Sequence, residues 1–145
     1  MKKLLLVVIT LLIPISVFAY EPDPHYWLWY NSSERYGYFI SKEPVKLVQD
    51  TNVQTVYRAN VQVVFATPIR NAKFIIARVE ITEDKHTGDV YMRWLTSAAF
   101  NENKQGLEGS PQPTKQRLII PSSMHWRIYE MIIDTYNRQQ NKKAA

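Results

Sequence analysis

A long stretch of alternating side chains constrains this chain more than any other feature. Between residues 51 and 68, apolar or small side chains at odd positions alternate with mostly polar ones at even positions. A period of two places successive side chains on opposite faces of a strand. The predicted buried face consists of Val53, Thr55, Tyr57, Ala59, Val61, Val63 and Phe65. The even positions turn apolar only near Val64, which predicts that the second face is covered there. This register predicts that Val61→Lys is strongly destabilising and that Gln62→Lys changes little.

Other segments predict further strands of the same antiparallel sheet. The polar turn at 31–35 separates two strand-like runs, and the polar loop at 83–89 separates two more, so each is expected to join a hairpin. In the run at 90–100, alternation places Ala98 and Phe100 on one face with Val90, Met92 and Trp94. Residues 45–48 fit either a short strand or a turn of helix, and 117–120 predict a last short strand. The glycine- and proline-containing segment 101–115 predicts a surface loop.

A helix is predicted at the carboxyl end. Pro121 stops the preceding strand, and Ser122 or Ser123 can cap the first helical turn with its hydroxyl. The apolar stripe that should pack on the sheet consists of Ile128, Tyr129, Ile132, Ile133 and Tyr136. Residues 138–145 are polar and are expected to fray. The predicted fold class is α+β, with an antiparallel sheet of about five or six strands and a single carboxy-terminal helix on one face.

A cluster of aromatic residues follows a leader that contains two prolines. Pro22 and Pro24 prevent regular structure, so a short extended leader should precede the first strand. The run from Tyr26 to Tyr30 has two interpretations. Trp and Tyr are frequent anchors of binding surfaces, but they are also ordinary strand formers, and Trp27 and Trp29 share one face. We favour packing within the sheet over a ligand platform.

The first nineteen residues have the pattern of an export signal. Two lysines precede an apolar core at 4–18, and Val17 and Ala19 are the small residues that a signal peptidase recognises before a cut. An uncut membrane anchor is the alternative, but the apolar run contains a proline and is shorter than the roughly 20 residues of a spanning helix. We predict cleavage before Tyr20 and a single exported domain at 20–145, in the periplasm or outside the cell.

Composition limits the kinds of site that this domain can carry. The formal charge of +5 falls to +3 once the two lysines of the signal are removed, and the remaining basic residues are scattered. A basic stripe suited to a phosphate backbone is missing, so we predict no nucleic-acid partner. The sequence has no cysteine. Disulfides, thiolate metal sites and a lipid anchor on cysteine are thereby excluded, and we expect no stable membrane anchor after cleavage.

No residue pattern indicates catalysis, a metal site or a cofactor. The residues that we considered are His25, His86, His125, Ser122, Ser123, Glu83, Asp84 and Asp89. The histidines are far apart in sequence, and no HExxH or similar pair is present. The two serines are more typical of a helix cap than of a nucleophile. The acidic residues are predicted on a solvated turn without the ligand spacing of a helix-loop-helix calcium site. We therefore predict a protein without enzymatic activity.

The order of elements and two local segments resemble a known family. The sequence Ala-Arg-Val-Glu-Ile-Thr at 77–82, and Ile-Pro-Ser-Ser at 120–123 before a helix containing Ile128 and Tyr129, resemble the surface-adhesin protein E-like domain of exported bacterial proteins. The resemblance covers 27–136 in layout. It implies a small antiparallel sheet with a carboxy-terminal helix, and it implies attachment to host extracellular proteins, as in the named adhesins of the family.

Two features of that family are missing from this sequence. The family's adhesins are lipid-anchored at a cysteine, and a disulfide ties a strand to the helix. By the resemblance, the equivalent positions here lie near Glu83 and at Ile133. Both cysteines of the disulfide are absent together, so neither is left unpaired and the fold can be retained. The missing lipid anchor makes display on the cell surface harder to retain than the fold.

These observations predict an exported, non-catalytic binding domain. Its partner is expected to be a protein, either a host extracellular protein or a component of the cell envelope. The alternative is a soluble periplasmic accessory or structural protein. The sequence leaves open which residues contact the partner and whether copies of the chain associate.

Overall fold

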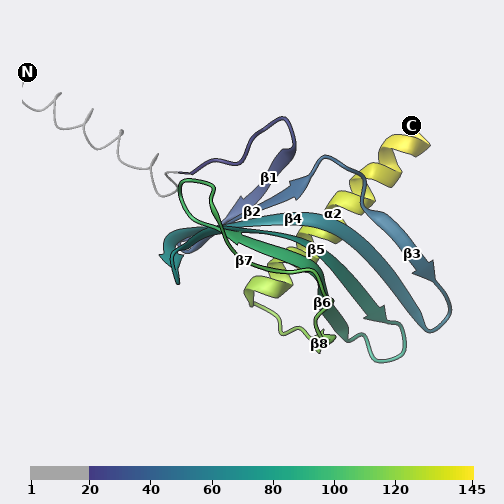
Figure 1. Cartoon of the computed structure of the whole chain (residues 1–145). Coiled ribbons are helices and arrows are strands. Elements are labelled where there is room, and N and C mark those ends of the chain that lie inside the picture. The colour runs from purple at the N-terminus through teal and green to yellow at the C-terminus, as the bar shows by residue number, and fades with distance from the viewer. Residues whose placement is uncertain (1–19) are drawn as a thin grey trace, which may run out of the picture.

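The computed structural model describes residues 20–145, which form one antiparallel sheet and one helix (Figure 1). The elements are β1 (Trp27–Ser32), β2 (Tyr36–Ser41), β3 (Lys46–Asp50), β4 (Gln54–Ile69), β5 (Ala72–Asp84), β6 (Val90–Phe100), β7 (Gly106–Ser110), β8 (Arg117–Leu118) and α2 (Met124–Ala144). Across the sheet the strands follow the order β1-β2-β4-β5-β6-β7, with β3 beside β4 and β8 beside β6. The predicted α+β class is confirmed.

The sheet has eight strands, more than the five or six that the sequence predicts. β7 forms inside the segment 101–115, which was expected to be a loop, and it pairs with the end of β6. Its residues are nearly all exposed and include two glycines, so no apolar alternation marks this strand in the sequence. Of the two alternatives for 45–48, a strand or a turn of helix, the structure shows the strand, because β3 pairs with the start of β4.

The long predicted strand exists as β4, and β5 returns alongside it. Their pairing is unbroken from Gln54 opposite Asp84 to Val64 opposite Phe74. Arg70 and Asn71 make the turn, with φ of 49° and 67°. Two positive φ angles suit a two-residue hairpin turn whose twist matches that of the strands.

The other edge of β4 carries two strands in series. β3 pairs with residues 55–58 and β2 with residues 61–65. Ala59 and Asn60 lie between the two pairings. The Asn60 amide reaches across this interval and donates to the Glu43 carboxylate at 2.9 Å.

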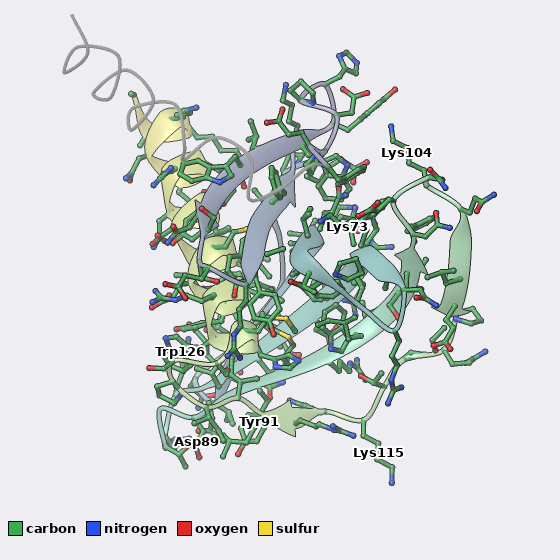
Figure 2. The ribbon with its side chains drawn as sticks, turned by 90° about the vertical axis from the view of Figure 1, so that its left-hand side faces the viewer. Lys73, Asp89, Tyr91, Lys104, Lys115 and Trp126 are labelled. Atoms are coloured by element: carbon green, nitrogen blue, oxygen red, sulfur yellow. The ribbon has the colours of Figure 1, made fainter. Side chains whose placement is uncertain are left out.

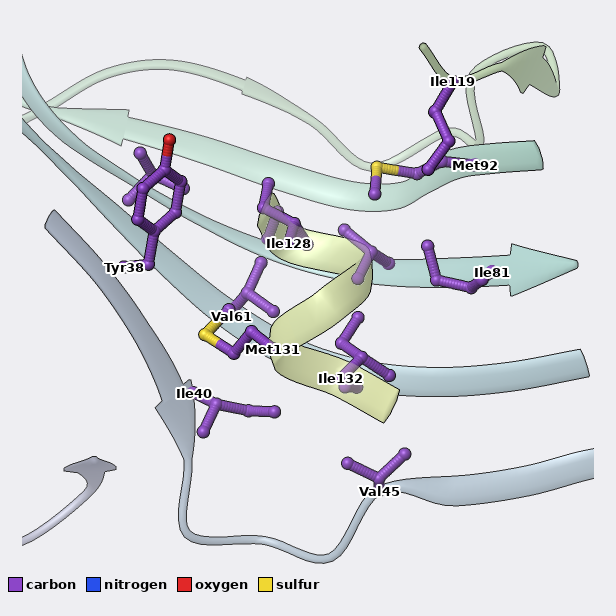
Figure 3. Close-up of a cluster of buried hydrophobic side chains, with 14 of the residues drawn as sticks. Tyr38, Ile40, Val45, Val61, Ile81, Met92, Ile119, Ile128, Met131 and Ile132 are labelled. Atoms are coloured by element: carbon purple, nitrogen blue, oxygen red, sulfur yellow. The ribbon is translucent and has the colours of Figure 1, made fainter. Parts of the chain in front are cut away.

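The main core lies between one face of the sheet and α2. The odd-numbered face of β4 is buried at its centre, where Val61 and Val63 are almost completely inaccessible. From the helix, Ile128, Met131 and Ile132 are fully buried against this face (Figure 3). The predicted buried face is therefore confirmed over the central part of β4, but Val53 at its start is exposed.

The helix packs along a slightly different line from the predicted stripe. Ile128 and Ile132 are buried as expected, but Tyr129, Ile133 and Tyr136 are only half-buried. Met131 lies at the centre of the contact and was not part of the predicted stripe. Positions 128, 131 and 132 follow the i, i+3, i+4 spacing of a single helix face, so the buried face is rotated from the predicted stripe towards Met131 and away from Tyr129 and Ile133.

Both ends of α2 have identifiable hydrogen bonds. Ser123 is the amino-terminal cap, because its Oγ accepts the backbone N–H of Trp126 at 3.1 Å. At the other end the helix continues through Ala144, which corrects the expectation that 138–145 frays. Gln139 Oε1 accepts the backbone N–H of Val45 at 3.1 Å and ties this part of the helix to the sheet. No helix among residues 20–145 combines the length and apolar character needed to cross a membrane.

The leader covers part of the sheet face opposite the helix, which we call the outer face. Tyr20 stacks on Phe74 with ring centroids 4.3 Å apart, and Phe74 stacks on Phe100 at 4.9 Å. Underneath, Gln62 and Val64 are completely buried. The prediction that the second face is covered near the end of β4 is confirmed. The expectation that Gln62 faces solvent is wrong, because a segment remote in sequence lies over it.

A bulge in β6 explains how Phe100 reaches the outer face. Val79 pairs with Trp94, but Arg78 pairs with Thr96, so Leu95 is an extra residue in the strand. One inserted residue exchanges the two faces of a strand from that point on. The predicted alternation in β6 is therefore wrong after Leu95.

Two tyrosine hydroxyls connect the helix to the sheet. Tyr129 donates to Glu83 of β5 at 2.7 Å, and Tyr30 of β1 donates to Asp134. Burial raises the pKa of Tyr129 well above its usual range, and the bond to Glu83 acts in the same direction. The bond between Tyr129 and Glu83 links β5 to the helix one turn before Ile133.

Candidate partner-binding surface

β1 forms one end of the sheet and has a single strand neighbour, β2, among residues 20–145. Its outer edge therefore presents backbone groups that no neighbouring strand pairs. Proteins commonly protect such an edge with proline, lysine or an inward charge. The sequence of β1, Trp-Leu-Trp-Tyr-Asn-Ser, contains neither proline nor charge. A register shift between Trp29 and Asn31 interrupts the pairing of β1 with β2.

The aromatic residues around β1 are divided between packing and exposure. Tyr30 points towards the helix, and burial together with its bond to Asp134 raises its pKa to about 12. Trp27 is half-buried. Trp29 and Tyr26 remain 64% and 61% exposed. The preference for packing is therefore wrong for these two side chains, because the described residues around them cover less than half of each.

A groove lies beside this edge on the outer face. It encloses about 330 Å³ between the leader and the β1–β2 hairpin, and its aromatic and proline walls are Tyr20, Pro22, Pro24, Trp27, Trp29 and Phe39. Gly37 also lines the groove, and Glu21 is its one charged lining residue. Trp29 and Phe39 are paired across the two strands, so the sheet itself fixes their separation. We call these residues the aromatic groove.

The buried carboxylate of Glu80 on the outer face already binds two arginines. Glu80 Oε2 accepts Arg58 Nε at 2.7 Å, and Glu80 Oε1 accepts Arg93 Nη2 at 2.6 Å. The Glu80 side chain is only 8% exposed, while both arginines are more than one-third exposed. Two charge-assisted bonds on neighbouring strands indicate that Glu80 holds the sheet together.

The residues considered for catalysis do not meet at one site. Ser123 is used as the helix cap, and Glu83 accepts the hydroxyl of Tyr129. Asp84 accepts the backbone N–H groups of Thr87 and His86 within its turn, and these bonds hold its carboxyl pKa below the usual value. Among residues 20–145, no three histidine or acidic side chains are grouped to hold a metal ion.

The histidines and the remaining serine are also dispersed. His25 and His86 are exposed in separate turns, and His125 is half-buried near the start of α2. Ser122 precedes the cap with a φ of 68° and is exposed. Asp89 lies at the end of the exposed turn between β5 and β6. Val17 and Ala19, the predicted recognition residues for signal cleavage, lie outside the described residues, so that prediction stays untested.

Sequence reasoning found the aromatic run but not its exposure. The missing information was the position of β1 at the end of the sheet, which depends on long-range pairing. One local signal was present, since 25–33 contains no lysine, arginine or acidic residue to mark a protected edge. Comparison with known proteins found no match: no family model fits the chain, and no curated protein or solved structure is significantly similar to it.

Proposed function

We propose that this chain is an exported, non-catalytic binding domain that holds an extended segment of a partner protein along β1. The observation that carries the proposal is the exposure of Trp29 beside the unpaired edge of an uncharged strand. The resemblance to the surface-adhesin protein E-like family supports a partner outside the cell or in its envelope.

Strand addition suits the chemistry of this edge. An added strand would pair with the free backbone groups of β1, while alternate side chains of the partner would enter the aromatic groove. Main-chain pairing supplies affinity and the groove supplies selectivity. Tryptophan and tyrosine are frequent energetic centres of protein interfaces. Fully burying an exposed large side chain contributes about 1.5–3 kcal/mol, so covering the exposed parts of Trp29 and Tyr26 would contribute about 2–4 kcal/mol in total.

Site-specific crosslinking in cells tests this assignment. A photoreactive amino acid replaces Trp29 in one variant and Val48 in the control, since Val48 is a similarly apolar, 44% exposed residue on the separate strand β3. The expected result is a discrete adduct with another protein at position 29 and none at position 48. An adduct of the chain with itself would instead identify a second copy as the occupant, and the absence of any adduct at 29 would contradict the proposal.

The cellular compartment decides which class of partner to pursue. Intact cells are treated with protease while a periplasmic protein serves as the internal control. Digestion of this chain with the control spared supports an adhesin-like role and binding to host matrix proteins. Full protection supports the accessory role inside the envelope, and the crosslinked partner should then be an envelope component.

A further inference from the structure

A second cavity lies at the opposite side of the sheet from β1, where α2 begins. It encloses about 400 Å³ between β6, the segment 114–120 and the first turn of the helix. Its apolar wall includes Met92, Trp94 and Ile119. Met92 and Ile119 lie together at this margin of the core (Figure 3). A volume of this size with a mainly apolar wall and a few polar groups is typical of small-molecule sites. We call it the helix-start cavity.

The charged groups of this cavity all have the same sign. Lys115 and Arg117 are the charged side chains that line it, and no aspartate or glutamate does. Neither cation forms an ion pair within residues 20–145. Lys115 extends outward from the margin of the cavity (Figure 2). The positive potential is therefore uncompensated by the protein, and an anion would complement it.

His125 adds a polar group to the inner wall. Its ring is half-buried and meets Trp94 edge-on, with ring centroids 6.0 Å apart. Burial lowers the pKa of His125, and the neighbouring charge of Arg117 lowers it further. The imidazole is thus neutral near pH 7. A neutral imidazole offers one N–H donor, and its ring nitrogens form no hydrogen bond with the other described residues.

We propose that the helix-start cavity binds a small amphipathic organic anion. Its aliphatic or aromatic body lies against Met92, Trp94 and Ile119, and its carboxylate or equivalent group faces Arg117 and Lys115. The arrangement separates an apolar wall from a cationic margin, which selects against both neutral and cationic molecules of the same shape. This site is separate from the aromatic groove, so the proposal stands or falls independently of the one for β1.

Calorimetric titration with matched ligands tests the proposal. The probes are decanoate, decanol and decyltrimethylammonium, which share an alkyl chain and differ in charge. Decanoate should bind with Kd below about 1 mM, at least tenfold more tightly than decanol, and the cation should not bind detectably. An aromatic carboxylate such as indole-3-acetate, compared with decanoate, shows which apolar body the wall prefers.

A pair of double variants identifies the site. Arg117→Gln with Lys115→Gln should weaken decanoate binding at least tenfold and leave decanol binding unchanged. Arg138→Gln with Lys142→Gln removes the same charge from the exposed far end of α2 and should change neither. Circular dichroism of both variants checks that the fold is retained. Equal binding of decanol and decanoate, equal losses in the two double variants, or no decanoate binding below about 1 mM would each overturn the proposal.

Discussion

Gln62 is a polar side chain whose burial leaves half of its amide without a partner. Nε2 donates to the Tyr20 hydroxyl at 3.2 Å, but Oε1 has no hydrogen bond within residues 20–145, and the side chain is completely buried. Rotating the amide by 180° would exchange the two atoms and still leave one of them unpaired. A buried polar group without a partner costs about 1–3 kcal/mol, and a neutral hydrogen bond contributes about 0.5–1.5 kcal/mol.

These magnitudes predict that Gln62→Met is tolerated or stabilising. Methionine has a similar length and adapts its shape, so it can fill the same space. The variant loses the bond to Tyr20 but also removes the unpaired acceptor, so the free energy of unfolding should stay unchanged or rise by up to about 2 kcal/mol. Urea unfolding measures the difference, provided that the slope with denaturant is the same for both proteins.

The matched control is Gln54→Met on the same face of β4. Gln54 is only partly buried and donates to Gln49 at the surface, at 3.2 Å. This variant should change the free energy of unfolding by less than about 0.5 kcal/mol. A loss of more than about 1 kcal/mol in Gln62→Met alone would show that the Gln62 amide is fully satisfied in solution and would refute the reasoning.

Three further perturbations test other parts of the fold. Glu80→Gln leaves two arginines facing a neutral side chain. It should lower the free energy of unfolding, measured in urea, by only about 1–3 kcal/mol, because water partly solvates the arginines. Glu108→Gln on exposed β7 should have almost no effect in the same measurement. Val61→Lys buries an unpaired charge at a fully inaccessible position and should cost more than about 4 kcal/mol by thermal unfolding, whereas Val53→Lys in the exposed turn just before the strand should be tolerated. His125 has a pKa below its unfolded value of 6.5. As the pH falls, the unfolded chain therefore binds this proton before the folded chain does, and the free energy of unfolding should decrease through about pH 6.5. His125→Gln should remove this part of the pH dependence. If the variant and the original chain lose stability equally between about pH 7 and 5, the assignment is contradicted.

Local pattern was sufficient to predict the layout of this domain. Period-two alternation identified β4, β5 and the start of β6, and the proline–serine sequence at 121–123 identified the start of the helix. These features depend on neighbouring residues alone. Met131 was missed because its neighbours on the same side of the helix, Arg127 and Thr135, are polar, whereas the predicted stripe is continuously apolar.

Features that depend on distant contacts were not predictable from one sequence. Gln62 is chemically suited to solvent, and only the stacking of Tyr20 on Phe74 makes its position interior. The extra residue at Leu95 reverses the faces of β6 without any glycine or proline to mark it. The same limit applies to the candidate site, since the position of β1 at the end of the sheet follows from its pairing with β2 alone.

The two strands in series along β4 have a consequence for how the sheet opens. β3 is exposed at every residue and pairs only with β4, while β2 lies beside the buried core. Breaking the β3 pairing disturbs neither β2 nor the central contact of α2. Amide protons of β3 should therefore exchange with solvent long before those of β2, through a local opening that leaves the rest of the domain folded. The loop at 51–53, which is held by hydrogen bonds in the closed state, would become accessible to a protease through this opening.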